Sequence, residues 1–347
     1  MTLHDSASKT SAPTTVLSGG DVYSSADPFA TALAVDGPTV AWVGGDEAAA
    51  DTVGGPDATR IDLAEDFVTP GLVTAGLDLR THSVTAEDLV AAGITAAHVV
   101  GQSSAVASFA DRAPAGFTVH AYPLDAAEAP ADPADTVPSG PAAVRVTDLD
   151  TTALPAAARF LLVDDAADLA ALRTLLADSA FRTHAQRHAY RVLVSTPLGA
   201  EDVDPLASSG IGLTLDPAAH DQPLAPLLAA GAQVSFALDP ARPWATLAAA
   251  VFGTTAGISA RAAFNAVTRF AHRATGDFEG GTLRPGAPAT MVRWKVSELV
   301  VQVADERVAA WSTDPRSGTA GLPDLSDPAQ LPEVVTVWLA GSPQTRS

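Results

Sequence analysis

Apolar runs recur along the middle of the chain with the spacing of buried strands. They alternate with alanine- and leucine-rich segments of helical character, such as residues 166–178. Continuous apolar runs between helices are typical of parallel strands that are covered on both faces. We therefore predict an α/β fold, a (β/α)8 TIM-like barrel, with strands at 72–77, 94–100, 117–122, 143–147, 159–163, 191–196, 211–215 and 233–238.

Shorter strand patterns lie at both ends of the chain. The hairpin signal Asp36-Gly37 separates two of them near the N-terminus, and others follow residue 289. Strands before and after a barrel predict one small β-sandwich built from both termini. The expected parts are a loose tail (1–13), a composite sandwich (14–71 plus 276–347) and a barrel (72–275). The connection 125–141, rich in Ala, Asp and Pro, is a poor helix and can leave the barrel incomplete.

Composition narrows the possible partners. The chain has 40 Asp+Glu against 20 Lys+Arg, a formal charge of -20, which disfavours nucleic acid and anionic membranes. It has no cysteine, so disulfides, thiolate metal sites and a cysteine nucleophile are excluded. No signal-peptide pattern or membrane-spanning apolar run is found, so we expect a cytoplasmic protein. A small-molecule ligand in the barrel mouth is the expected partner, and the oligomeric state is not indicated.

Four segments carry a resemblance to a known family. They are ALAVDGPTVAWVG (32–44), FVTPGLVTAGLD (67–78), AAGITAAHVV (91–100) and the C-terminal block that begins GISARAAFNAVTR (257–269) and continues through GGTLRPGAPATMVRW and WSTDPRSGTAGLPDL. They resemble the amidohydrolase superfamily, most closely its family-3 branch. The resemblance implies a TIM barrel with a β-sandwich, in a chain shortened after the first barrel strand and between the second and fifth.

The resemblance also implies a metal-dependent hydrolase of carbon–nitrogen bonds other than peptide bonds. In that family, histidines on strands 1, 5 and 6 and an aspartate after strand 8 hold a divalent metal, usually zinc, which activates water. Here Gly76 and Asp78 stand in place of the His-x-His motif, and Leu161 and Val194 stand near the other histidine positions. Asp239 alone is kept. Because zinc needs about three protein ligands, we predict no metal ligands and no cofactor.

Other polar residues remain candidates for a site. Asp239 is the candidate catalytic residue. His82 and His220 fall in loops that can reach a pocket, although a plain loop histidine is the simpler interpretation for each. His98 lies within a predicted strand, where a packed histidine is more common than a ligand. His120 is similar, and the pair His184 and His188 is interpreted as a solvated helix end.

Aspartates follow most of the predicted strand ends. Carboxylates gathered at one rim could bind Mg²⁺ or Ca²⁺, but aspartate is also a preferred helix cap, and capping is the favoured interpretation. One of these aspartates, Asp216, is a further candidate for lining a pocket. The full set is Asp78, Asp125, Asp148, Asp164, Asp165, Asp216 and Asp239.

Two functional hypotheses follow. The favoured one is a degenerate amidohydrolase, a pseudoenzyme that keeps the scaffold for binding and lacks the standard metal-dependent activity. The alternative is an active hydrolase of amides or cyclic amides, in which Asp239 activates water and ligands come from an unexpected set such as His82, His98 and His220.

Overall fold

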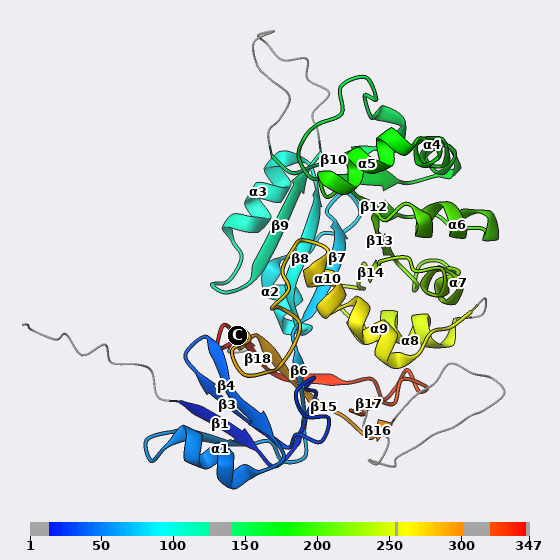
Figure 1. Ribbon diagram of the computed structural model, residues 1–347. Coiled ribbons are helices and arrows are strands. Elements are labelled where there is room, and N and C mark those ends of the chain that lie inside the picture. The colour runs from blue at the N-terminus through cyan, green and yellow to red at the C-terminus, as the bar shows by residue number, and fades with distance from the viewer. Residues whose placement is uncertain (1–13, 125–139, 254–255, 301–319, 345–347) are drawn as a thin grey trace, which may run out of the picture.

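Eight parallel strands form the middle of the protein (Figure 1). The computed structural model describes residues 14–124, 140–253, 256–300 and 320–344. One sheet has the order β7-β8-β9 and the other β10-β11-β12-β13-β14. The predicted α/β class is confirmed, and the strands are β7 (Leu72–Asp78), β8 (Ile94–Gly101), β9 (Thr118–Pro123), β10 (Ala142–Arg145), β11 (Arg159–Val163), β12 (Arg191–Val194), β13 (Gly212–Leu215) and β14 (Val234–Phe236).

Backbone groups make few hydrogen bonds where the edges of these two sheets meet. A single parallel bridge pairs Leu124, after β9, with Ala143 of β10. On the other side, the amide of Leu238, just after β14, donates to Oγ1 of Thr74 in β7 at 3.1 Å. The strands thus follow the predicted barrel order. Between β9 and β10, and between β14 and β7, the described residues form no continuous ladder of backbone hydrogen bonds; we call these two places the seams. Full closure of the cylinder stays a prediction.

Side chains on these strands alternate between two environments, as the period of two requires. Leu161, Val163 and Val192 pack against the helices in the largest hydrophobic cluster. Phe160 and Leu193 belong to a second cluster inside the strands. The covering helices are α2 (Ala86–Ala91), α3 (Ser103–Asp111), α4 (Ala166–Ala177), α5 (Ser179–Arg187), α6 (Ala200–Ser208), α7 (Leu224–Ala229), α8 (Pro243–Phe252), α9 (Ala260–Ala266) and α10 (Arg269–Arg273), with a 3-10 turn η1 (Val146–Asp148) after β10.

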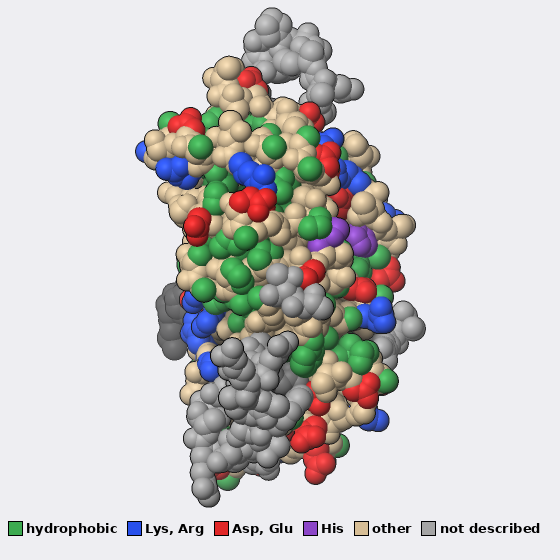
Figure 2. All heavy atoms as spheres, turned by 90° about the vertical axis from the view of Figure 1, so that its right-hand side faces the viewer, with side chains coloured by type: hydrophobic (Ala, Val, Ile, Leu, Met, Phe, Trp, Pro, Cys, Tyr) green, Lys and Arg blue, Asp and Glu red, His purple; other side chains and the backbone are tan. Residues whose placement is uncertain are grey.

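The helical face is mixed in charge. Figure 2 shows acidic, basic and apolar side chains interspersed over the side on which α4 to α8 lie in Figure 1. The acidic excess of the chain is therefore not gathered into one patch on this face. None of the helices in the described ranges is long and apolar enough to cross a lipid bilayer.

Strands from both ends of the chain build a second, all-β part. In one of its sheets, β15 pairs antiparallel with β6 from the N-terminal segment and with β18 from the C-terminal one. Leu33, Val68, Met291 and Trp338 share its core. Its elements are β1 (Thr15–Ser18), β2 (Asp21–Val22), β3 (Ala32–Asp36), β4 (Thr39–Gly44), α1 (Glu47–Gly54), β5 (Thr59–Asp62), β6 (Phe67–Pro70), β15 (Met291–Lys295), β18 (Glu333–Leu339) and β19 (Ser342–Gln344), with the small pair β16 (Leu299–Val300) and β17 (Leu322–Pro323) beside them.

Some sequence-based expectations fall on residues outside the described ranges. These are the tail 1–13, Asp125, most of the connection 125–141, residues 301–303 of a strand expected at 300–303, and part of the C-terminal motif.

Trp294 ties the two parts together. It lies on β15 and is almost completely buried, and its indole Nε1 donates to Oγ1 of Thr69 at 2.8 Å. Its ring packs edge-on against Trp244 of α8, with centroids 5.3 Å apart. Gly93, just before β8, has a φ of +83°, and a Cβ at this position would lie 2.2 Å from the Trp294 ring. Glycine is thus required there both by backbone conformation and by packing.

We expect Gly93→Ala to destabilise the protein by about 2–5 kcal/mol, because left-handed strain and overpacking add. Gly286→Ala is the matched control, since Gly286 has a φ of +85° and a Cβ added there would have no neighbour within 4 Å. It should cost about 1–2 kcal/mol from strain alone. Urea unfolding of both variants measures the difference, and equal losses would show that Trp294 does not restrict this position.

Candidate functional site

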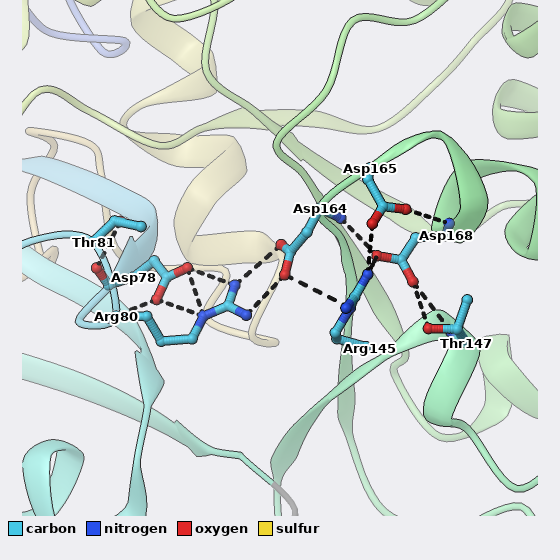
Figure 3. A network of polar contacts seen from close by, with 8 residues as sticks. All are labelled: Asp78, Arg80, Thr81, Arg145, Thr147, Asp164, Asp165 and Asp168. Carbon is cyan, nitrogen blue, oxygen red and sulfur yellow. Dashed lines mark hydrogen bonds and ion pairs between the residues drawn. The ribbon is translucent and has the colours of Figure 1, made fainter.

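Arg80 spans the carboxyl ends of the barrel strands, the end at which barrel enzymes hold their active sites (Figure 3). Asp78 ends β7 and Asp164 directly follows β11, so the two carboxylates belong to different sheets. The Arg80 guanidinium lies between them, with Nη2 at 2.7 Å from Asp78 Oδ2 and Nη1 at 2.8 Å from Asp164 Oδ2. Arg80 therefore links the two sheets across the strand ends.

A second arginine extends the same network. Arg145, the last residue of β10, places Nη2 at 2.7 Å from Asp168 Oδ2 and 2.9 Å from Asp165 Oδ2. Asp168 is fully buried and also accepts from Thr147 Oγ1 at 2.8 Å. Burial acts to raise the pKa of Asp168, but the hydrogen bonds from Arg145 and Thr147 outweigh it, and the pKa is lowered. The buried carboxylate is thus held ionised.

Asp239 and Asp216, the acidic candidates, bind their own backbone. Oδ1 of Asp239 accepts from the amides of Ala241 and Arg242 at 2.9 and 3.1 Å, in the turn before α8. Oδ1 of Asp216 accepts from two amides of the turn after β13 in the same way. Both carboxylates therefore stabilise the turn that follows their strand.

The histidine candidates lie apart. Nδ1 of His82 is 3.1 Å from the Asp78 carbonyl oxygen, in an exposed turn. Nε2 of His220 is 3.0 Å from the carbonyl oxygen of Ser195. His98 is inside the strands and 1% exposed. No group of three or more His, Asp or Glu able to hold a metal occurs in the part of the chain that the structure describes.

The zinc implied by the resemblance is not matched by these residues. Zinc needs about three converging nitrogen, sulfur or oxygen ligands, whereas the carboxylates at the mouth converge on guanidinium groups. Arg80 and Arg145 were missed by sequence reasoning, which searched for ligand residues. The available signal was an arginine two residues after a strand-end aspartate, in Asp78-Leu79-Arg80.

Neutral histidines lie side by side on strands β8 and β9, and a third lies on helix α10. Arg191 Nη1 donates to His98 Nδ1 at 2.8 Å, and the rings of His98 and His120 meet edge-on at 5.0 Å. Burial, and then the charge of Arg191, lower the pKa of His98 well below its ordinary value. Burial also lowers the pKa of His120 and of His272, although Asp277 at 2.9 Å opposes the shift for His272. These histidines stay uncharged at neutral pH.

The fold is similar to that of several hydrolases. Triazine hydrolase from Arthrobacter aurescens has a TM-score of 0.63 at 15% identity, covering 96% of this chain and 94% of that one. Atrazine chlorohydrolase from Arthrobacter aurescens TC1, complexed with zinc, has a TM-score of 0.62 at 15% identity, and the match covers 94% of each chain. N-isopropylammelide isopropylaminohydrolase from Burkholderia multivorans ATCC 17616 gives 0.59 at 16%, covering 95% and 98%.

These neighbours belong to the amidohydrolase superfamily, so the resemblance seen in the sequence is confirmed at the level of the fold. No protein-family model matches the sequence, and no curated protein sequence matches it. At such low identities, the similarity shows the fold alone.

We expect Arg80→Met to lower the free energy of unfolding by about 1–3 kcal/mol, because it leaves the Asp78 carboxylate without its cation and Asp164 with only Arg145, whose Nε is 3.9 Å away. This loss is smaller than for a fully buried ion pair, because the Arg80 side chain is 27% exposed and water screens its charge. Arg60→Met is the control, because the pair of Arg60 with Asp51 lies at the surface and should be worth about 0.5 kcal/mol or less. Equal small losses in chemical denaturation would contradict a structural role for Arg80.

Stability should fall on acidification. The unfolded chain takes up protons at histidines near pH ~6.5, whereas His98, His120 and His272 have lower pKa values when folded. The stability that depends on these neutral histidines is therefore fully present above about pH 6.5, and the free energy of unfolding falls progressively below that pH. Urea unfolding between about pH 7.5 and about pH 5.5 measures the slope, which His98→Gln should reduce. A stability that rises towards acid would contradict this.

Proposed function

We propose that this chain is a member of the amidohydrolase superfamily whose barrel mouth binds small polar molecules without metal-dependent hydrolysis. The observation that carries the proposal is the position of Arg80 between the carboxylates of β7 and β11. A catalytic metal needs ligands and an open coordination position there. The described mouth residues offer a fixed guanidinium instead.

Arg80 cannot replace a metal in the chemistry. Its pKa is raised, first by the hydrogen bond to Asp78 and further by Asp164, so it stays charged at all accessible pH values. A guanidinium donates hydrogen bonds, but it has no open coordination position and cannot bind and ionise a water molecule. The charge at the mouth therefore favours binding of polar groups and holds the strands together.

A cavity beside the mouth supplies a place for such a ligand. It has a volume of about 440 Å³ and lies between the turn after β7 and helix α3. Its polar side chains include His82, Ser104, Ser108 and Arg112. Its volume falls within the range of small-molecule sites. His82, a pocket candidate from the sequence, thus lines a cavity, and we propose it as a ligand contact.

The alternative is an active hydrolase of carbon–nitrogen bonds. Asp239 follows β14 at the carboxyl end of the strands, and its Oδ2 is 3.9 Å from Arg242 Nε. One structural neighbour is named an isopropylaminohydrolase. This alternative requires Asp239 to leave its turn and His82, His98 and His220 to converge, which the described geometry disfavours.

Metal analysis and kinetics separate the two proposals. Protein purified without chelator should contain far less than stoichiometric zinc, manganese or iron by elemental analysis, because no ligand set among the described residues holds them. It should show no turnover of amides, cyclic amides or aminotriazines with added Zn²⁺ or Mn²⁺. Stoichiometric metal, together with hydrolysis that Asp239→Asn abolishes and Asp216→Asn leaves intact, would establish the alternative.

A further inference from the structure

Two neighbouring arginines lie where helices α9 and α10 meet the β part of the protein. Arg261 is in α9 and Arg269 begins α10. Both lie near the phenol of Tyr23, in the segment after β2: burial raises the pKa of Tyr23, and the two arginine charges oppose the rise. No described carboxylate is paired with either arginine, although the chain has 40 Asp+Glu against 20 Lys+Arg. These two cations are therefore exceptional in an acidic protein.

Packing fixes the position of this pair. The Tyr23 ring lies edge-on against Phe264 of α9, with centroids 4.7 Å apart. Gly281 has a φ of +70°, and a Cβ at this position would lie 2.5 Å from the amide nitrogen of Arg269, so the loop at Gly281 lies directly against the start of α10. Arg261 and Asn265 are four residues apart on α9 and therefore share one face of that helix.

The positive charge of the pair is not compensated by the described residues. Burial lowers the pKa of Arg269, and the charges of Arg273 and Arg261 lower it further, against the effect of Tyr23. A guanidinium nevertheless remains protonated near neutral pH. The three arginines thus repel one another, and a bound anion would remove this repulsion.

A cavity of about 290 Å³ lies against both arginines. Its polar lining includes Tyr23, Ser25, Arg261, Asn265 and Arg269, and none of the described residues that line it is acidic. Arg261 and Ser25 are exposed, and Arg269 and Asn265 are half-buried, so their polar groups can reach a ligand. The Nε of Arg269 is buried, which leaves its Nη atoms as the donors to the cavity.

We propose that this cavity binds a phosphate group, either as the free ion or as part of a small phosphomonoester. Phosphate carries close to two negative charges, which match two guanidinium groups, and its oxygens can accept from donors on several sides. Arg261 and Arg269 supply the charged donors, and the Asn265 amide and Ser25 hydroxyl supply neutral ones. A volume near the lower end of small-molecule sites suits a ligand of this size.

The site is separate from the barrel mouth. Pro70, which also lines the cavity, ends β6 just before β7 begins, so the cavity is at the amino end of the barrel strands. The mouth with Arg80 is at their carboxyl end. The inference therefore does not depend on the proposed function.

Calorimetric titration of the full chain with inorganic phosphate and with glycerol 3-phosphate tests this site. At about pH 7.5, where phosphate groups are mostly doubly charged, we expect saturable binding of at least one of them. Acetate at equal ionic strength should bind at least about tenfold more weakly, because it carries one charge and two acceptor oxygens. Tighter binding of the ester would identify a phosphorylated small molecule as the ligand, and tighter binding of the ion would identify free phosphate. Absence of saturable binding by both, or acetate binding as tight as theirs, would overturn the proposal.

Two variants locate the binding. Arg261→Gln and Arg269→Gln should each weaken binding about tenfold or more, because each removes a charge-assisted contact. Arg60→Gln is the matched control: it removes the same charge from an exposed position of the β part and should leave binding unchanged. Circular dichroism verifies the fold of each variant, and if Arg269→Gln fails to fold, the exposed Arg261 decides alone.

Two outcomes would contradict the assignment. One is binding that survives the loss of both arginines, or that falls equally in Arg60→Gln, which would indicate attraction to the overall charge and not to this cavity. The other is binding that Arg112→Gln abolishes and Arg261→Gln leaves intact, which would place the phosphate in the cavity beside the mouth.

Discussion

The guanidinium of Arg80 between Asp78 and Asp164 is the interaction on which the carboxyl end of the barrel depends. The two sheets meet at seams with few backbone hydrogen bonds, so side chains must hold their ends in register. An arginine suits this task because its planar fork can bind two carboxylates at once and stays charged. Arg145 repeats the arrangement beside it with Asp165 and Asp168. Each of these four aspartates thus has an arginine partner within the protein.

Charge is arranged differently at the two ends of the strands. At the carboxyl end, four carboxylates surround two guanidinium groups and leave a negative balance (Figure 3). At the amino end, Arg191 is buried among neutral groups. The first arrangement favours cationic or hydrogen-bond-donating ligands, whereas the second is closed off from solvent, because Arg191 is only 3% exposed. One scaffold therefore presents two chemically opposite environments, separated by a packed interior.

The strands could be predicted from the sequence because a parallel strand that is buried on both faces appears as a short, continuous apolar run between helical segments. It placed Asp239 and Asp216 after strand ends, but it could not decide their roles, since a turn-capping aspartate and a catalytic one occupy the same position. The ion pairs of Arg80 were out of reach for another reason. Asp164 is 84 residues away from Arg80, and neither sequence segment indicates that the two side chains meet. His98 was correctly placed within a strand. Its partner Arg191 begins another predicted strand, 191–196, and the sequence does not indicate that these two side chains meet.

A crystal structure of protein grown with zinc, with anomalous data collected at the zinc edge, tests the central claim most directly. We predict Arg80 between Asp78 and Asp164, and no anomalous peak among the carboxylates of the mouth. A zinc peak there, bound by protein side chains with Arg80 displaced, would contradict a mouth built on the guanidinium.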